Sequence, residues 1–451
     1  LDDVPREPDA VAWTSNYTLA TADEGDLDGG SRGFTLFSKN GKVLFKAGNT
    51  VEHLVTRIGH YPEDRSENKG NEPEGIEFGQ YSKDKILFVG SERSSVVAVY
   101  QLRHQWPKAK FLQVLPAGVG PEGLLAVPQR NLFVVASEVD DRGDKIRSSI
   151  SIYKRMKGQP TYPTVKSADR EDGLPIPWGA LSALAADPED PYKAYTAYDS
   201  FYRQSRIFEL DLSDFPALIT NEIVLTDGGM TVDLDVEGLA VRTGGGFWVV
   251  SEGAGTVGDT DRPFETLNLL LKVDDEGEIL EEIKLPKSVN DLQRRFGFEG
   301  VAECVSKDDK KVKNKRGKKD DDCDFVYVAF QREWVDDPAG KVRIGRYDTE
   351  SEKWAFYYYP IDTPTSPNGG WVGLSEIIAL GDKKFAVIER DNQGGPDARI
   401  KKIYEFSVAG LTPQPQDSKT PFPVLEKELV RNLIPDLTAD NGFVLEKVEG
   451  L

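Results

Sequence analysis

The feature that most constrains this chain is a short motif, glutamate followed by glycine and an aliphatic residue, that repeatedly opens a hydrophobic run. A motif that recurs at intervals of this length indicates a repeat architecture in which each copy begins one structural unit. Clear copies begin at Glu74, Glu122, Glu237 and Glu299, and weaker ones at Asp9, Ser182 and Glu376.

Each unit has the same interior. A turn and a second β-rich run follow the first run, and the second run mostly closes on an acidic residue, as in ILFVGSE, LFVVASE and FWVVSE. Third and fourth runs follow, such as SSVVAVYQL and KFLQVLP. Four short runs rich in β-branched and aromatic residues, separated by glycine, aspartate and asparagine, are typical of a β-propeller blade. The sequence predicts an all-β fold: one propeller over residues 1–451 with seven four-stranded blades beginning near residues 9, 74, 122, 182, 237, 299 and 376.

Two features leave the closure of this propeller open. Residues 157–177 are a natural seam, so the chain could instead contribute parts of two propellers. Val448-Glu449-Gly450-Leu451 is an eighth copy of the motif, which suggests that the native polypeptide continues. If the seven units form one ring, residues 443–451 are expected to supply a closing strand. The best helix candidate is KSVNDLQRRF, before the sixth unit.

The charge of the chain restricts its partners. A net charge of −20 argues against nucleic acids and anionic membranes and favours cations. No apolar stretch of about 18 residues or more is present, so no membrane span is expected. The chain starts at Leu1 without an initiator methionine or a signal peptide, and we expect it to be processed or cropped.

The two cysteines fall inside one predicted blade. Cys304 ends its first strand and Cys323 begins its second, so they should face each other across an antiparallel pair at the base of a lysine-rich loop. We predict a disulfide, worth roughly 3 kcal/mol in the chain-entropy model, and therefore an oxidising compartment: secreted, periplasmic or at the cell surface. The alternative is two unpaired thiols in a cytosolic protein.

The geometry of a blade predicts that the glutamates lie together and form a candidate site. The start of the first strand lies beside the end of the second, and first strands line the central channel. A ring of carboxylates is therefore expected around one channel mouth, with Glu74 beside Glu92, Glu122 beside Glu138, Glu237 beside Glu252, and Glu376 beside Glu389. The predicted metal-ligating set is Glu24, Glu74, Glu92, Glu122, Glu138, Glu237, Glu252, Glu299, Glu376 and Glu389, with Asp26 and Asp28 from a following loop.

Something must neutralise such a ring, because two carboxylates about 4 Å apart repel by roughly 4 kcal/mol at an effective dielectric of 20. Ca²⁺ suits all-oxygen sites of this kind. Arginine is the second candidate, since Arg93, Arg332 and Arg390 each directly follow the residue that closes a second run. Shared protons are the third. In the alternative interpretation the glutamates only cap backbone amides. Because the histidines are scattered along the sequence, we do not expect a zinc site.

Two parts of the chain resemble known families. About residues 178–451, with DVEGLAVRTGGGFWVVSEGAG, GFEGVAE and LSEIIALGDKKFAVIERDN, resemble the phytase-like family described by an esterase-like activity. About residues 1–155, with PEGIEFG and GPEGLLAVPQRNLFVVASEVDD, resemble the choice-of-anchor propellers of bacterial secretion. Both resemblances imply exported propellers, and some members are described as alkaline phosphatases. Neither supplies catalytic residues to carry over.

Two functions fit these observations. The first is an extracytoplasmic, Ca²⁺-dependent phosphoester hydrolase acting on a small phosphorylated substrate, with Arg93, Arg332 or Arg390 as the phosphate clamp. The second is a non-catalytic, cation-stabilised propeller that binds a protein partner. The residues that replace carboxylates at Ser182 and Gln331 slightly favour the second.

Overall fold

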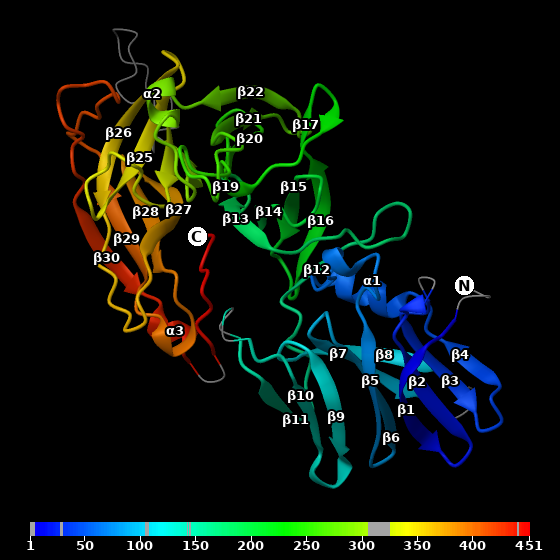
Figure 1. The fold of residues 1–451 in the computed structure, drawn as a ribbon. Coiled ribbons are helices and arrows are strands. Elements are labelled where there is room, and N and C mark those ends of the chain that lie inside the picture. The colour runs from blue at the N-terminus through cyan, green and yellow to red at the C-terminus, as the bar shows by residue number, and fades with distance from the viewer. Residues whose placement is uncertain are drawn as a thin grey trace. The chain divides into compact units, whose positions relative to one another are not determined.

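A computed structural model describes residues 5–27, 30–103, 108–141, 143, 146–304, 325–439 and 442–451. The protein is all-β, as predicted: antiparallel sheets follow one another along the chain, most of them four-stranded and with their strands in chain order (Figure 1). This is the sheet arrangement of propeller-like folds. The chain divides into two compact units, Leu1–Gly179 with Asp211–Asn221, and Ala180–Leu210 with Glu222–Leu451.

Unit 1 contains three sheets. The first has strands β1 (Pro8–Ser15), β2 (Thr18–Asp23), β3 (Gly33–Ser38) and β4 (Val43–Lys46). The second has β5 (Pro73–Tyr81), β6 (Asp84–Ser91), β7 (Val96–Leu102) and β8 (Ala109–Pro116). The third has only β9 (Pro121–Val127), β10 (Leu132–Ser137) and β11 (Ser149–Lys154). Strand β12 (Val165–Ser167) does not join β11 but pairs in parallel with Ala217–Ile219 at the start of β16.

Four further sheets in the described residues lie wholly or partly in unit 2. The first has β13 (Leu181–Ala186), β14 (Lys193–Tyr198), β15 (Arg206–Asp211) and β16 (Ala217–Val224), with β12 as its fifth strand. Asp211 and residues 217–221 of this sheet belong to unit 1. The second has β19 (Val236–Val241), β20 (Phe247–Ser251), β21 (Leu269–Val273) and β22 (Ile279–Lys284), and a small hairpin, β17 (Thr226–Asp227) and β18 (Met230–Thr231), precedes it. The third has β23 (Phe298–Glu303), β24 (Phe325–Phe330), β25 (Lys341–Asp348) and β26 (Lys353–Pro360). The fourth has β27 (Val372–Gly381), β28 (Lys384–Asp391), β29 (Lys401–Ser407) and β30 (Lys427–Asn432).

The first strands lie where the repeated motif predicts them, with one difference. Six begin one residue before the predicted position, but β27 begins at Val372 rather than near Glu376. The early start follows from burial, because Val372 and Leu374 are buried and Val372 pairs with Asp391 at the end of β28. The third sheet has three strands in the described chain, against the four predicted. A single ring of seven blades stays a prediction, as does the alternative of two propellers.

A β-bulge accounts for the recurrence of the motif. In β5, Pro73 pairs with Ser91 and Gly75 with Gly90, so Glu74 is the extra residue of the bulge. Register shifts at the corresponding place occur in all seven first strands. A bulge re-aims one side chain and bends the strand. The side chain of each motif residue therefore points in a different direction from that of a residue in regular antiparallel pairing.

The cores lie between consecutive sheets. Large side chains of one sheet pack on the next, as where Phe88 of β6 stacks on Phe133 of β10 with ring centroids 3.8 Å apart. Between the third and fourth sheets of unit 2, Tyr327 packs on Phe385 with centroids 4.4 Å apart. Fully burying one such ring stabilises the fold by roughly 1.5–3 kcal/mol. Alternate strand residues supply these faces, which explains the period-two pattern of the sequence.

The helices differ from the prediction. Of KSVNDLQRRF only Lys287–Asn290 is helical (α2), and α3 (Ile434–Leu437) is equally short. The longest, α1 (Thr50–Arg57), was not predicted; it buries Val51 and Val55 on one side and so has the spacing of an amphipathic helix. None of the helices in the described residues is long and apolar enough to cross a membrane.

Two predicted features have different outcomes. Residues 443–451 form no strand, so the predicted closing strand is wrong. Cys304 directly follows β23 and is 6% exposed, but Cys323 lies outside the described residues. The disulfide therefore stays a prediction.

Candidate functional site

The first strands of unit 2 approach one another through the motif glycines. A Cβ on Gly238 would lie 2.7 Å from the carbonyl oxygen of Glu299, and one on Gly300 would collide with Glu376. Only glycine allows backbones this close. The motif therefore brings Glu237 of β19, Glu299 of β23 and Glu376 of β27 toward a common centre.

The eighth copy of the motif, in residues 448–451, lies among these strands (Figure 1). Ser182 at the bulge of β13 donates to the carbonyl oxygen of Val236 at 2.5 Å, and Ser375 at the bulge of β27 donates to that of Val448 at 2.7 Å. Val236 and Val448 each directly precede a Glu-Gly pair. The C-terminal copy therefore contacts β27 through the same hydrogen bond by which β19 contacts β13. A Cβ on Gly450 would in turn lie 2.9 Å from Leu184 of β13.

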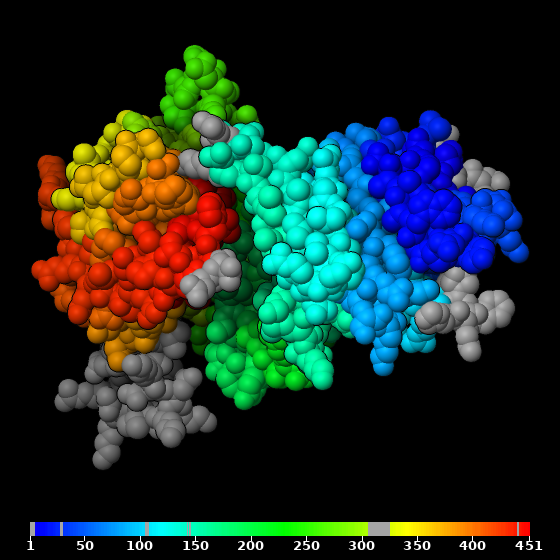
Figure 2. Space-filling model, turned by 90° about the horizontal axis from the view of Figure 1, so that it is seen from below, coloured from blue at the N-terminus to red at the C-terminus, as the bar shows by residue number. Residues whose placement is uncertain are grey.

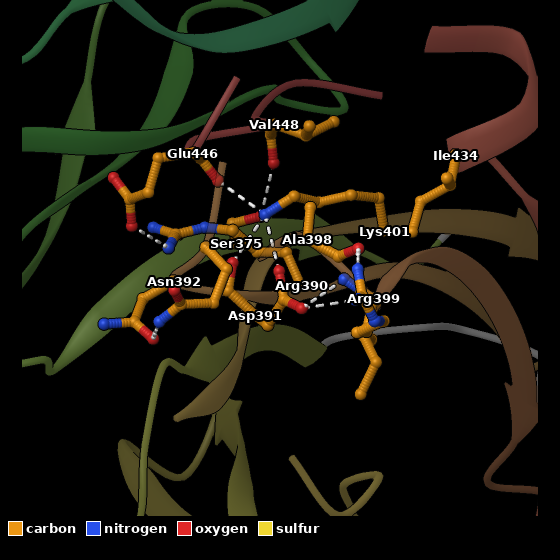
Figure 3. A network of polar contacts seen from close by, with 12 residues as sticks. Ser375, Arg390, Asp391, Asn392, Ala398, Arg399, Lys401, Ile434, Glu446 and Val448 are labelled. Atoms are coloured by element: carbon orange, nitrogen blue, oxygen red, sulfur yellow. Dashed lines mark hydrogen bonds and ion pairs between the residues drawn. The ribbon is translucent and has the colours of Figure 1, made fainter. Parts of the chain in front are cut away.

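Buried cations hold this C-terminal segment in place (Figure 3). Lys401, whose side chain is 0% exposed, donates to the carbonyl oxygen of Glu446 at 2.7 Å and pairs with Asp391 at 2.9 Å. Arg390 pairs with Glu446 at 3.1 Å and with Glu449 at 3.3 Å. In Figure 2 the red C-terminal residues lie beside the orange residues of the last sheet. Glu449 thereby joins the motif glutamates of unit 2.

Three carboxylates of unit 2 could hold a metal ion. Asp235, Glu237 and Glu252 each offer an oxygen, and these oxygens lie within 4.8 Å of one another. Asp235 and Glu237 flank Val236 at the start of β19, and Glu252 directly follows β20. The amide of Glu252 donates to the carbonyl oxygen of Asp235 at 2.8 Å, which fixes the two backbones side by side. The predicted pair Glu237 and Glu252 is therefore close together.

These carboxyl groups hold protons unusually tightly. Burial raises the pKa of Glu252 to about 7 and raises that of Glu237 well above its usual value, with Asp235 and Glu252 adding to the effect on Glu237. Burial and then Asp199 raise the pKa of Asp235. Burial also raises the pKa of Glu299 and Glu376 well above the ordinary value. Without a counter-ion the cluster is therefore costly to ionise.

Among the described residues, one carboxylate oxygen of Glu299 and one of Glu376 are buried without a hydrogen-bond partner. Glu299 accepts from the side-chain amide of Gln331 and Glu376 from the amide of Ile377, each through one oxygen. The second oxygen of each, Oε2, is buried and unpaired among the described residues, although the two residues are only 2% and 1% exposed. An unsatisfied buried oxygen is costly, so each must hold a proton or face a cation.

Few positive charges face this cluster. Lys447 is the main one: burial alone would lower its pKa, but Glu449, Glu237 and Glu299 outweigh burial and raise it. Its side chain is nevertheless 54% exposed and lies 3.6 Å from Glu449. The other is Arg390, already paired with Glu446 and Glu449. Carboxylates therefore outnumber cations in this cluster.

Arg332 and the rings of Phe296 and Trp371 lie next to the acidic cluster of unit 2. Gly297 donates to Glu252, and the preceding residue, Phe296, has a left-handed backbone with φ of 70°. The guanidinium of Arg332 lies 5.4 Å from the ring of Phe296 and 4.8 Å from that of Trp371. Burial lowers the pKa of Arg332, and Arg294 adds to the effect. No carboxylate pairs with Arg332 in the described chain, and its Nε is buried without a partner.

Unit 1 has a corresponding acidic cluster, built from Glu24, Glu72 and Glu74, whose oxygens also lie within 4.8 Å of one another. Here cations are abundant. Glu72, 1% exposed, pairs with Arg65 at 2.9 Å, Lys69 at 3.2 Å and Arg93 at 2.6 Å. Lys69 also pairs with Glu24, and Arg93 with Glu92 at 2.8 Å. Burial alone would raise the pKa of Glu72, but Arg93 and Lys69 outweigh it and lower the pKa.

The predicted pair Glu74 and Glu92 lies in contact in unit 1. Burial, followed by a hydrogen bond to Glu92, raises the pKa of Glu74 to about 8. This pair therefore favours a proton shared between its two carboxyl groups.

Other predicted site residues lie elsewhere. Glu122, Glu138 and Asp26 are exposed and belong to neither group of oxygens, and Asp28 lies outside the described residues. The prediction that Glu389 lies beside Glu376 is wrong. β28 continues for two residues beyond Glu389, which instead accepts from Lys427 at 2.6 Å and Tyr359 at 3.0 Å. At the bulge of β27 stands Ser375, so the seventh copy is shifted by one residue from the predicted alignment.

Sequence reasoning missed Glu72 and Asp235, although a signal for both was present. Each lies two residues before a motif glutamate, in Glu72-Pro73-Glu74 and Asp235-Val236-Glu237. At the same place the copies at Glu122 and Glu299 have glycine, and the eighth copy has Lys447. An acidic residue at this position distinguishes the two copies that gather three carboxylates.

Comparisons with known proteins agree with both resemblances. A family model described as "Choice-of-anchor I domain" matches residues 27–105, inside the range predicted for it. A search of the curated proteins found no match.

Similar solved structures are distant. They include a putative 6-phosphogluconolactonase from Bacteroides fragilis (12% identity, TM-score 0.27, covering 92% of this chain and 99% of that one). They also include PorZ, a surface component of the type-IX secretion system of Porphyromonas gingivalis (11% identity, TM-score 0.30, covering 90% and 48%). Similarity at this level supports no argument about function.

A second family model, described as "Phytase-like: Esterase-like activity of phytase", matches residues 176–451. This range includes β13–β30 and the acidic cluster of unit 2. Because the match covers more than half of the chain, the protein belongs to the phytase-like family.

Proposed function

We propose that the protein is an extracytoplasmic, Ca²⁺-dependent phosphoester hydrolase whose site lies in unit 2. The observation that carries the proposal is the group of Asp235, Glu237 and Glu252, with oxygens within 4.8 Å of one another and few cations to balance them. The family description, esterase-like activity of phytase, supports the reaction class, and the match to a choice-of-anchor domain supports a location outside the cytoplasm.

The residues present fit a hard cation. All candidate ligands are carboxylate oxygens, which Ca²⁺ prefers, and it accepts six to eight of them. Asp235, Glu237 and Glu252 would hold the ion. Glu299, whose Oε2 is unpaired, is close enough to Glu237 and Glu252 for their charges to raise its pKa further. A divalent cation bound there would polarise a phosphoryl oxygen and lower the pKa of a bound water.

The chain's own contribution to substrate binding is Arg332. Of the three predicted phosphate-clamp residues, Arg93 is occupied by Glu72 and Glu92, and Arg390 by Glu446 and Glu449. Arg332 has no such partner, and the rings of Phe296 and Trp371 position its guanidinium. An arginine held in this way presents parallel N–H groups to two phosphate oxygens.

The test is hydrolysis of p-nitrophenyl phosphate by the whole chain, with Ca²⁺ or with a chelator. We expect activity only with Ca²⁺, its loss in Glu237→Gln, and a fall of roughly 100-fold in kcat/KM in Arg332→Met. Glu428→Gln and Arg431→Met, which change exposed groups on β30, are the matched controls and should retain activity. Activity that persists in chelator, or in Glu237→Gln, would contradict the proposal.

A second candidate is a non-catalytic binding module stabilised by the same cation. The residues at two carboxylate positions favour it, because Ser182 donates to the carbonyl oxygen of Val236 and Gln331 donates to Glu299, so both hold the structure together. Ca²⁺ binding without hydrolysis of any phosphoester, with a protein partner bound instead, would support this candidate over the first.

A further inference from the structure

The third sheet of unit 1 ends in an unpaired strand. β11 pairs with β10 along one edge, and no described residue pairs with its other edge. The chain leaves β11 as coil, and the next strand, β12, pairs with β16 instead. An edge strand of this kind presents a row of free backbone N–H and C=O groups, which is a template for pairing with another segment.

A cavity of about 670 Å³ lies beside this edge. Phe88 and Leu112 of the second sheet line one side, and Phe133, Ile152 and Tyr153 of the third sheet line the other. In complete sheets a fourth strand fills the corresponding space: β26, for example, buries Phe356 and Tyr359 with 0% exposed. The free edge and the cavity are thus two separate signs of one missing strand.

The charged residues of the edge segment itself are all basic. Residues 146–158, IRSSISIYKRMKG, contain Arg147, Lys154, Arg155 and Lys157 and no acidic residue, in a chain whose net charge is −20. Arg147 and Arg155 pair with Asp140 and Asp84. Lys154 and Lys157 are exposed and have no carboxylate partner among the described residues. Antiparallel pairing with β11 of a second copy would bring basic ends together, so charge disfavours a dimer through this edge.

We propose that β11 and the adjacent cavity bind an extended segment of a partner protein, which adds a fourth strand to this sheet. The segment carries apolar residues at alternate positions, because residues i and i+2 of a strand share a face and would enter the cavity. It carries acidic residues that pair with Lys154 and Lys157. This interaction is independent of the acidic cluster in unit 2, and its strand, β11, is labelled beside β10 in Figure 1.

The test uses the whole chain and two synthetic peptides of about ten residues. One alternates valine or leucine with glutamate, and the other replaces each glutamate with lysine. We expect the acidic peptide to bind at least about tenfold more tightly in fluorescence anisotropy and to slow amide hydrogen exchange in residues 149–154. Leu112→Glu, which places a charge in the cavity, should abolish binding, and Lys154→Glu should weaken it severalfold. Leu429→Glu, an exposed position on the outer strand β30, is the matched control.

Several results would overturn the proposal. Equal binding of the two peptides, or unchanged binding in Leu112→Glu, would exclude recognition at this edge. Binding without slower exchange in residues 149–154 would exclude strand addition. A dimer in solution that Leu112→Glu converts to monomer would assign the edge to a second copy. An apolar dye that fills the cavity while the acidic peptide fails to bind would identify a small-molecule pocket instead.

Discussion

The two units balance their buried carboxylates in opposite ways. In unit 1, Glu24, Glu72 and Glu92 pair with Arg65, Lys69 or Arg93, and the raised pKa of Glu74 favours a proton between it and Glu92. In unit 2 the carboxylates outnumber the cations, and burial raises the pKa of each of Asp235, Glu237, Glu252, Glu299 and Glu376. The same motif therefore builds a self-neutralised cluster in one unit and a cluster that needs protons or a cation in the other.

This difference originates outside the motif. Arg65 and Lys69 belong to the connection between α1 and β5, and Arg93 follows β6. The corresponding connection of unit 2, before β19, contains Asp227, Asp233 and Asp235 and no lysine or arginine. The charged residues of the surrounding loops thus determine whether a carboxylate cluster forms internal ion pairs or has charge left to bind a cation.

The largest expected effect is in unit 1, where Glu72→Gln should destabilise the protein whether or not Ca²⁺ is present. The change removes a buried charge that holds three cations, and we expect a loss of about 3 kcal/mol in the free energy of unfolding. The lower end of the range for buried pairs applies because the cations are partly exposed. Urea titrations with Ca²⁺ and with chelator measure it; a loss that Ca²⁺ reverses would mean that this cluster also binds the ion.

The second prediction concerns Glu237 in unit 2, where the effect of one substitution on Tm should change sign when Ca²⁺ is added. Without Ca²⁺, Glu237→Gln should raise Tm slightly, because the amide removes a buried group that resists ionisation. With Ca²⁺ at about 100 times its Kd, the wild type should gain about 2.7 kcal/mol that the variant lacks. The order of the two Tm values should therefore reverse on adding the ion. If chelation leaves the wild-type Tm unchanged, the cluster holds protons alone.

The pH dependence of stability should locate the shared proton of unit 1. The folded-state pKa of Glu74 is raised to about 8, so its contribution to stability is present below the unfolded value and is lost as pH rises toward 8. Glu74→Gln keeps a hydrogen-bond donor toward Glu92 and cannot ionise. The variant should match the wild type in Tm near pH 5 and exceed it above pH 8. Parallel Tm curves over this range would show that Glu74 and Glu92 share no proton.

The smallest effect concerns Lys447, the ammonium that stands in the eighth copy where Asp235 stands in the fifth. Glu449, Glu237 and Glu299 outweigh burial and raise its pKa, so its ammonium group offsets part of the negative charge that a metal ion would otherwise offset. Because its side chain is 54% exposed, we expect Lys447→Met to tighten Ca²⁺ binding only a few-fold. Calorimetric titration measures the change, and Lys447→Arg should bind as the wild type does. Weaker binding in Lys447→Met would mean that Lys447 orders the site.

Much of the fold could be predicted from the sequence. The alternation of apolar and polar residues, the turns and the recurring Glu-Gly pair located the first strands to within one residue in six sheets, because these are local properties of the chain. The seventh was displaced, since Ser375 rather than Glu376 occupies the bulge. Local pattern also located the pairs Glu74 with Glu92 and Glu237 with Glu252, which strand pairing alone brings together.

The sequence by itself thus determined where carboxylates gather. Only the tertiary structure decided what balances them, because Coulomb interactions depend on distances between segments far apart in the chain. Lys69 reaches Glu24 across 45 positions, and Arg390 reaches Glu449 across 59. Packing likewise decides that Arg93 and Arg390 form ion pairs with carboxylates, whereas Arg332 forms none among the described residues. The repeat places an acid at the bulge of five first strands, and the surrounding loops determine which of these acids receives a charge partner.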